Sequence, residues 1–370
     1  MKRIFIIVVV ICSSLSLLAE PIGTPYSVLS LPYSARLSGL GGDQVSLNDG
    51  ELSMATRNPS LLSDKTHMSL QLGYAFLGRG LNMATAMYGH NFGDRHSVDG
   101  KKHNMLAFGI HYLDYGKMQY ADEVGVRYGS FTAKDIVFSL IYARQLGTHF
   151  SIGASLKPVY SIYESYSSFA LAADVGFNYM TLENRFHLGL TLRNMGWQLK
   201  SFYSEDGDAH RESLPLDLAF GLDYKLKHAP LRFSLTAHHL QRWAIGFNSN
   251  GHGVYTTTIK EKNRLKDLND NAWETAQANG AVLWYDMLFR HLSFAIDIVP
   301  KKENFYLTFS YNHQRHAELT TTGDMSLCGF AAGAGLKIKQ FRLGASVAGL
   351  SKGHLTVNVT MTAAIGDFLK

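Results

Sequence analysis

The stretch Leu355-Thr356-Val357-Asn358-Val359-Thr360-Met361-Thr362-Ala363-Ala364-Ile365 decides the fold of this chain, because apolar side chains occupy every second position from Leu355 to Ile365. A period of two belongs to a β-strand whose two faces meet different surroundings. About fourteen segments after residue 65 show this alternation. Nothing else in the chain could cover so many apolar faces, so we expect lipid to cover them.

The predicted strands lie at 66–77, 81–92, 104–118, 131–145, 148–163, 168–181, 185–197, 214–227, 230–242, 287–299, 303–315, 327–338, 340–350 and 353–365. Short connections alternate with mostly longer ones at 119–130, 164–167, 198–213, 243–286 and 316–326, although the connection at 93–103 breaks the pattern. This alternation is typical of the periplasmic turns and extracellular loops of an outer-membrane barrel. The sequence therefore predicts an all-β fold, a transmembrane antiparallel β-barrel of about 14 strands with an N-terminal plug or hatch segment.

The pattern divides the chain into three regions. Residues 1–19 are predicted to be a secretory signal peptide, in which Lys2 and Arg3 precede an apolar run and small residues lead to a cleavage point near Ala19. Residues 20–65 show no strand period and gather prolines and glycines, so we expect the plug or hatch segment there. Residues 66–370 are expected to form the barrel in the bacterial outer membrane.

Composition excludes several classes of protein. The formal net charge of +5 is spread along the 370 residues, and no stretch combines clustered Lys and Arg with stacking aromatics, so we expect no nucleic-acid partner. After the N-terminus no apolar run is long enough for a membrane-spanning helix. Cys12 lies in the predicted signal peptide, which leaves Cys328 alone in the mature chain and excludes a disulfide within it.

Both ends of the mature chain carry a resemblance to a known family. At the N-terminal end it rests on Tyr33-Ser34-Ala35-Arg36-Leu37-Ser38-Gly39-Leu40-Gly41-Gly42, then Asn48-Asp49 and Arg57-Asn58-Pro59-Ser60-Leu61-Leu62. Toward the C-terminus it rests on Tyr311-Asn312-His313-Gln314-Arg315-His316, Gly329-Phe330 and Gly335-Leu336-Lys337-Ile338-Lys339-Gln340-Phe341-Arg342. These residues resemble FadL-like outer-membrane barrels and, among them, the PorQ family of the type IX secretion system.

The resemblance implies a non-enzymatic role. PorQ-like barrels anchor the surface protein PorZ in an attachment complex with PorU and PorV, which joins secreted cargo to lipopolysaccharide. The alternative that we keep is FadL-like transport of hydrophobic small molecules across the outer membrane. A lateral opening for such transport would need a break in a wall strand, and the sequence indicates none strongly. An outer-membrane lipase would need Ser and His facing lipid at the outer rim, where the predicted strands carry apolar residues instead.

The candidate site residues fall into two groups. The first group belongs to the plug. We favour the interpretation that the plug fills the lumen; the alternative is that it lines a gate for a hydrophobic ligand. The members of this group are Ala35, Arg36, Gly39, Gly41, Gly42, Asn58 and Pro59. The second lies in the long 243–286 connection, where residues 260–278 favour helix, and is predicted to dock a partner; its members are Trp243, Leu265, Leu268 and Trp273.

We expect no catalytic residue, no cofactor and no metal. His238 and His239 are neighbours in a predicted strand and so would point to opposite faces, which argues against a shared ion. His313 and His316 would also fall on opposite faces if their strand continued that far. The glycines Gly333 and Gly335 lie on the inward face of a predicted strand, where they are expected to let another segment approach.

Overall fold

The computed structural model describes residues 25–92, 104–181, 183–205, 208–209, 211–248, 252–268, 271–319, 327–351 and 354–367. The predicted signal peptide and its cleavage point lie outside these residues, as does the 93–103 connection that breaks the predicted alternation of short and long connections. None of the helices in the described ranges is long and apolar enough to cross a membrane.

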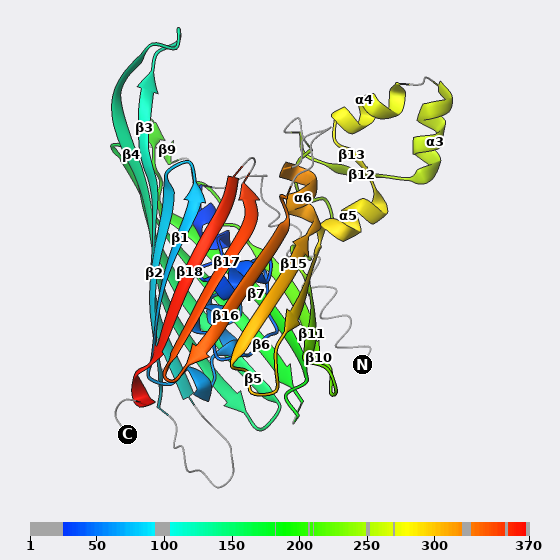
Figure 1. The fold of residues 1–370 in the computed structure, drawn as a ribbon. Helices are drawn as coiled ribbons and strands as arrows, with labels where there is room; N and C mark the ends of the chain where they lie inside the picture. The colour runs from blue at the N-terminus through cyan, green and yellow to red at the C-terminus, as the bar shows by residue number, and fades with distance from the viewer. Residues whose placement is uncertain are drawn as a thin grey trace.

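Fourteen antiparallel strands close into a barrel, with β1 paired to both β2 and β18 (Figure 1). The prediction of the fold class is confirmed. The barrel strands are β1 (Ser69–Gly78), β2 (Leu81–Asn91), β3 (Asn104–Ala121), β4 (Arg127–Leu146), β5 (Phe150–Tyr163), β6 (Tyr166–Met180), β7 (Phe186–Lys200), β10 (Asp217–Lys225), β11 (Leu231–Ala237), β14 (Leu292–Ile298), β15 (Phe305–Asn312), β16 (Phe330–Ile338), β17 (Phe341–Ser351) and β18 (His354–Ala364).

The wall strands turn their apolar side chains outward. In β18, Val357 and Val359 are 42% and 54% exposed, whereas Asn358 and Thr360 between them are buried in the barrel. This arrangement is the reverse of a soluble protein, in which apolar side chains fill the interior. A chain that exposes apolar side chains all round its wall needs lipid as its solvent, and the closed ladder leaves no unpaired strand edge in that lipid.

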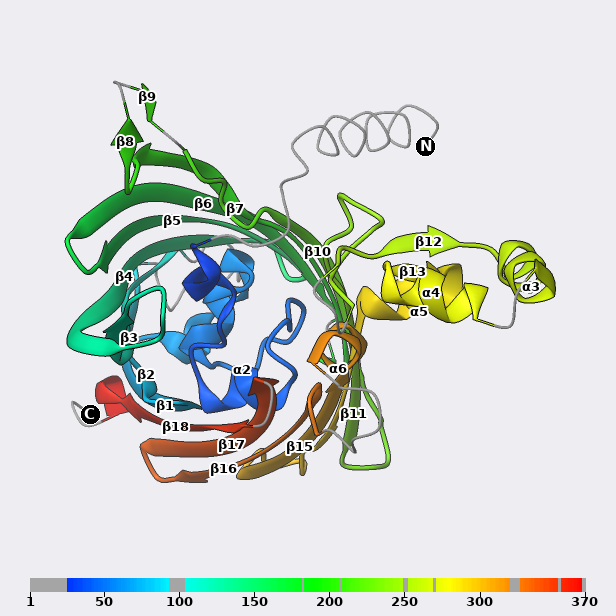
Figure 2. The same ribbon diagram turned by 90° about the horizontal axis from the view of Figure 1, so that it is seen from above.

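The N-terminal segment lies inside the barrel, where Figure 2 shows it in blue. Helix α2 packs against β16, β17 and β18, and the short helix η3 packs against β4, β5 and β6. The helical elements of this segment are η1 (Ser27–Ser30), α2 (Ala35–Gly39), η2 (Leu52–Thr56), η3 (Pro59–Leu61) and η4 (Asp64–Thr66). We refer to residues 25–65 as the plug.

Most of the additional structure gathers at one end of the barrel, the upper end in Figure 1. There the β3–β4 hairpin rises beyond its neighbours, and the connection from β11 to β14 forms a small folded unit. In outer-membrane barrels the end with the long connections faces the cell exterior. The elements at this end are β8 (Ser204–Glu205), β9 (Asp208–Ala209), β12 (Tyr255–Thr257), α3 (Ile259–Leu268), α4 (Ala272–Ala278), β13 (Ala281–Leu283), α5 (Trp284–Arg290) and α6 (His313–Leu319). A last short helix, η5 (Ile365–Asp367), follows β18 at the opposite end.

Several predicted strand ends are wrong at the upper rim. The strand predicted at 230–242 stops at Ala237, because His239 adopts a left-handed backbone with φ of 54°. The strand predicted from residue 287 begins at Leu292, since Trp284–Arg290 is helical, and the strand predicted to 315 gives way to a helix at His313. The connection predicted at 164–167 is only two residues long. The predicted helical tendency of residues 260–278 is confirmed by α3 and α4.

Candidate functional site

Arg36 joins the plug to the barrel wall. Its guanidinium lies 2.9 and 2.8 Å from the two carboxylate oxygens of Asp297 on β14, and its Nε donates to Asp49 at 2.8 Å. The hydroxyl of Thr308 accepts a further bond at 2.5 Å, and the ring of Tyr306 lies 4.2 Å from the guanidinium carbon. Arg36 and Asp297 are both almost wholly buried. This bidentate pairing fixes the orientation of the guanidinium relative to the carboxylate as well as the distance between them.

Two acidic plug residues beside Arg36 differ in their proton affinity. Burial would raise the pKa of Asp49, but the guanidinium groups of Arg36 and Arg342 outweigh it and hold that pKa at about 2. Burial raises the pKa of Glu51 to about 7, because Arg342 approaches it only to 3.7 Å and offsets the burial only in part. The carboxylate of Glu51 also accepts a bond from Gln71 on β1 at 3.0 Å.

A second group of charges holds the plug nearer the upper end. Asp43 lies 3.2 Å from Arg315 on α6 and 3.7 Å from Arg193 on β7, and Arg193 also pairs with Asp217. Burial would raise the pKa of Asp43, but Arg315, His238 and the arginines Arg57 and Arg193 hold it at about 2. The plug is therefore tied by ion pairs to β14 and β7, two strands on the same side of the wall, and to α6 above them.

Glycines permit the close approach of plug and wall. A Cβ added at Gly39 would lie 3.1 Å from the Cα of Gly333 on β16, which confirms the expectation that Gly333 lets another segment approach. Gly41 and Gly42 both have φ of 88°, a conformation that side chains disfavour, and Gly42 lies against the guanidinium of Arg315. Gly335 also faces inward, but the group that lies against it is the ring of Tyr306 on the neighbouring strand β15 and not a residue of the plug.

The remaining predicted plug residues also contact the wall. Ala35 donates its N–H to the hydroxyl of Thr360 at 2.8 Å. Asn58 donates to the carbonyl of Val45 at 2.7 Å, and its oxygen occupies the space beside Gly176. Pro59 occupies the space beside Gly153 in the same way. Sequence reasoning missed these wall glycines as contact points, although glycines at inward positions of several strands were a visible signal.

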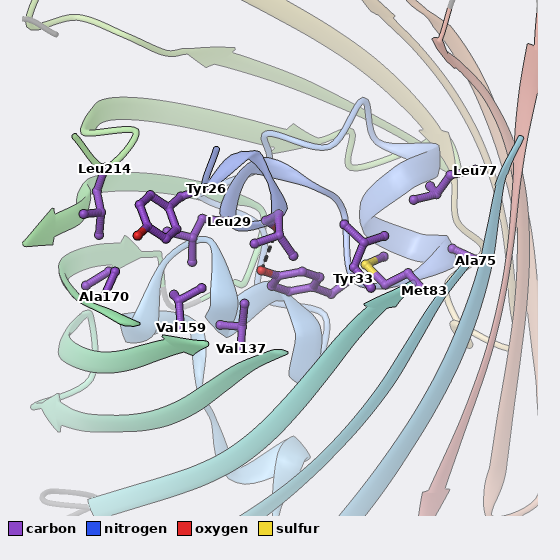
Figure 3. Close-up of a cluster of buried hydrophobic side chains, with 13 residues drawn as sticks. Tyr26, Leu29, Tyr33, Ala75, Leu77, Met83, Val137, Val159, Ala170 and Leu214 are labelled. Carbon is purple, nitrogen blue, oxygen red and sulfur yellow. Dashed lines mark hydrogen bonds between the residues drawn. The ribbon is translucent and has the colours of Figure 1, made fainter. Parts of the chain in front are cut away.

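An apolar cluster packs part of the plug against the wall. Tyr26, Leu29 and Tyr33 of the plug pack against wall side chains, and the hydroxyl of Tyr33 donates to the carbonyl of Val28 at 2.9 Å (Figure 3). The wall side chains in this cluster include Leu77, Met83, Leu113, Val137, Val159 and Leu214. The cavity beside Arg36, Asp49 and Glu51 has a volume of only about 40 Å³ and is lined largely by charged groups. It is too small and too polar for a hydrophobic ligand.

A larger apolar hollow of about 640 Å³ lies on the outer face of the wall. Its lining includes Ile152, Val175, Phe177, Leu190 and Leu218. The hollow adjoins an irregularity in the β6–β7 ladder, where the pairing shifts and Asn194 has φ of 58°. Both strands continue through this irregularity, so it is a shift in the pairing and not a break in a wall strand, and the sequence shows no strong sign of it. Lys157 and Asp174 form a buried ion pair with a 2.6 Å distance just inside it.

The connection between β11 and β14 folds into a unit of its own, which we call the upper module (residues 243–291). Strands β12 and β13 pair in parallel, and two apolar clusters lie beneath the helices. Trp273 belongs to one cluster, with Leu265 packed against it, and is only 7% exposed. Trp243 and Leu268 are 48% and 71% exposed. Of the four predicted docking residues, these two alone are well exposed for contact, and Trp273 supports the fold of the module.

The histidine pairs do not lie as the strand pattern predicted. His238 and His239 follow the end of β11, and their Nδ1 atoms approach to 2.7 Å, so they do not point to opposite faces. His313 and His316 lie on helix α6, and both rings contact Tyr311. In the part of the chain that the structure describes, no three His, Cys, Asp or Glu side chains form a group that could hold a metal ion.

Comparison with solved structures finds outer-membrane channels of similar fold. A deletion mutant of TodX, a monoaromatic hydrocarbon channel, superposes with a TM-score of 0.52 at 11% sequence identity, over 90% of this chain and 97% of that one. The monoaromatic hydrocarbon channel CymD gives 0.47 at 10% identity, over 92% and 98%. A Pseudomonas aeruginosa FadL homologue gives 0.41 at 11% identity, over 93% and 98%. No family model and no curated protein matches the sequence. The likeness shows the fold alone, a closed β-barrel like that of the TodX mutant.

Proposed function

We propose that this protein is a non-enzymatic outer-membrane barrel that anchors a surface partner through its upper module. The observation that carries the proposal is the contrast between lumen and module. The plug lies inside the barrel and is tied to the wall by the buried Arg36–Asp297 ion pair, whereas the module projects beyond the wall and has its own apolar clusters. A filled barrel gives the module a fixed position at the membrane, which is what an anchor needs.

The resemblance to PorQ-like barrels supplies the partner for this proposal. In that scheme PorZ would dock on the module, with PorU and PorV joining the same complex beside lipopolysaccharide. Trp243 and Leu268 are the predicted docking residues that offer exposed apolar surface, and exposed aromatic groups are frequent anchors at interfaces. Trp273 and Leu265 would contribute indirectly, by holding the module in shape.

The test replaces residues 255–283 by a short Gly/Ser linker in cells that make PorZ. We expect surface-retained PorZ to be lost while the barrel still shifts on heating in a gel, the mark of a folded barrel. The matched control shortens the β3–β4 hairpin at Asp122–Val126, which rises from the opposite side of the barrel, and should keep PorZ. Full retention after removal of the module would overturn the proposal.

Passage of hydrophobic small molecules is a second candidate, and the comparisons favour it over the first. TodX, which shares the fold of this chain, is a monoaromatic hydrocarbon channel. The observation on this chain that favours it is the apolar hollow on the outer wall beside the shift in the β6–β7 pairing. Uptake of radiolabelled toluene into proteoliposomes tests it: uptake above that of empty liposomes, lost on Leu218→Trp in the hollow, would support transport.

A further inference from the structure

We propose that helix α5 is an interfacial helix that lies in the headgroup layer of the outer leaflet and carries the upper module over the membrane. The proposal concerns lipid and holds for either candidate function. Seen from above, the module projects radially outward from the wall (Figure 2), and α5 lies outside the wall near the upper ends of the neighbouring strands (Figure 1). A segment in that place overhangs lipid.

The exposed face of α5 is apolar. Trp284, Tyr285, Leu288 and Phe289 are each between 39% and 49% exposed, whereas Met287 is fully buried against the module. At about 100° per residue the four exposed side chains cover an arc of roughly 140° on one side of the helix. This is the arrangement of helices that lie in a membrane interface.

The charges of α5 are removed from that face. Arg290 donates to Asp286 at 2.8 Å, and Asp286 also pairs with His313 at 2.9 Å. Burial would raise the pKa of Asp286, but His313 and Arg290 hold it below its usual range, so the carboxylate stays ionised within its pairs. Arg290 itself is almost fully buried. The exposed face is therefore uncharged, which lowers the cost of contact with lipid.

The same face continues the aromatic belt of the wall. Tyr311 and Phe330 lie on the lipid-facing side of β15 and β16 at their upper ends, with ring centroids 4.8 Å apart. His313 bridges this pair to α5, because its ring lies 5.9 Å from that of Tyr311 and 6.1 Å from that of Phe289. Aromatic side chains of barrels gather at the interface between hydrocarbon and water. Phe289 and Trp284 extend that belt outward from the wall.

The experiment measures where side chains of the module sit in phosphatidylcholine proteoliposomes of the whole barrel. In a Cys328→Ser background, a nitroxide is attached at Leu288→Cys on α5, at Leu268→Cys on α3 as the module control, and at Phe294→Cys as the lipid-facing reference on β14. We expect the 288 label to match the 294 label, with high oxygen and low nickel-chelate collision rates, whereas the 268 label meets the nickel chelate freely.

Three results would overturn the proposal. The first is that the label at residue 288 collides with the nickel chelate as often as the label at residue 268 does. The second is that the label at residue 268 is as well protected from the chelate as the label at residue 288. The third is protection of residue 288 only after a protein partner is added, which would assign the face to that partner. A second readout needs no label: Trp284→Phe should lower the fraction of tryptophan fluorescence that brominated lipid quenches. An unchanged fraction would also contradict an interfacial α5.

Discussion

Replacing Arg36 by Met should loosen the plug without unfolding the barrel. The substitution keeps most of the side-chain volume but leaves Asp297 buried without its main partner. Breaking one side of a buried ion pair costs about 3–5 kcal/mol. We expect the low end, about 3 kcal/mol, because Arg232 lies 3.8 Å from Asp297 and the hydroxyl of Thr308 still donates to it. Since both partners are almost wholly buried, solvent screening takes little away.

Hydrogen–deuterium exchange measures this loss directly. A cost of about 3 kcal/mol makes the opening equilibrium of the plug roughly 150-fold more favourable. Plug amides that exchange through this opening should therefore exchange roughly 150-fold faster. Peptides from residues 35–57 should show it, while peptides from β18 should exchange as in the wild type. The matched control is Arg185→Met, whose ion pair with Glu183 is largely exposed and should matter little. Plug exchange in Arg36→Met within threefold of the wild type would refute the reasoning.

Three further predictions concern the plug, the wall and the upper module in turn. Docked Glu51, whose pKa is raised to about 7, holds a proton that the released residue gives up near pH 4.5. Its contribution to plug protection should therefore be fully present near pH 4.5 and fall until about pH 7. Glu51→Gln should flatten this dependence in exchange measured between those two pH values. Val359→Arg should cost the barrel about 2–4 kcal/mol in folding titrations into vesicles, because Val359 faces lipid, whereas Val359→Leu should cost almost nothing. Trp273→Ala should destabilise the upper module by about 3–5 kcal/mol, because Trp273 lies in its apolar cluster. Protease should then cleave within residues 255–283 while the barrel still shifts on heating in a gel. A module that stays resistant to protease would argue against Trp273 as a core residue.

The alternation of side chains was enough to predict the wall. Strands such as β18 are predicted correctly because their residues alternate between the lipid and the barrel interior, and this alternation can be seen within a short stretch of sequence. Prediction failed where the backbone leaves the wall. Trp284–Arg290 reads as a continuation of apolar sequence, but its apolar residues fall at helical spacing, and His239 ends β11 through a backbone angle that no pattern announces.

The candidate site was predictable only in part, because its partners are distant in sequence. Arg36 stood out among the glycines of the plug, yet its partner Asp297 lies 261 residues away. Nothing in the alternation distinguishes Asp297 from other inward polar residues. Trp273 was singled out as a docking residue from composition, but whether a tryptophan in a loop is exposed depends on the loop's own packing, and here α3, α4 and β13 cover it.

The central claim is that the plug stays in the barrel while the protein works as an anchor, and a disulfide between plug and wall tests it most directly. A Cβ at Gly39 would lie 3.7 Å from the Cβ of Ser346 on β17, within the range that a disulfide needs. Gly39→Cys with Ser346→Cys, in a Cys328→Ser background, can therefore lock the plug on oxidation. The measurement is surface-retained PorZ with the lock closed and after reduction. The account predicts equal retention in both states; loss of retention with the lock closed, restored by reductant, would contradict it.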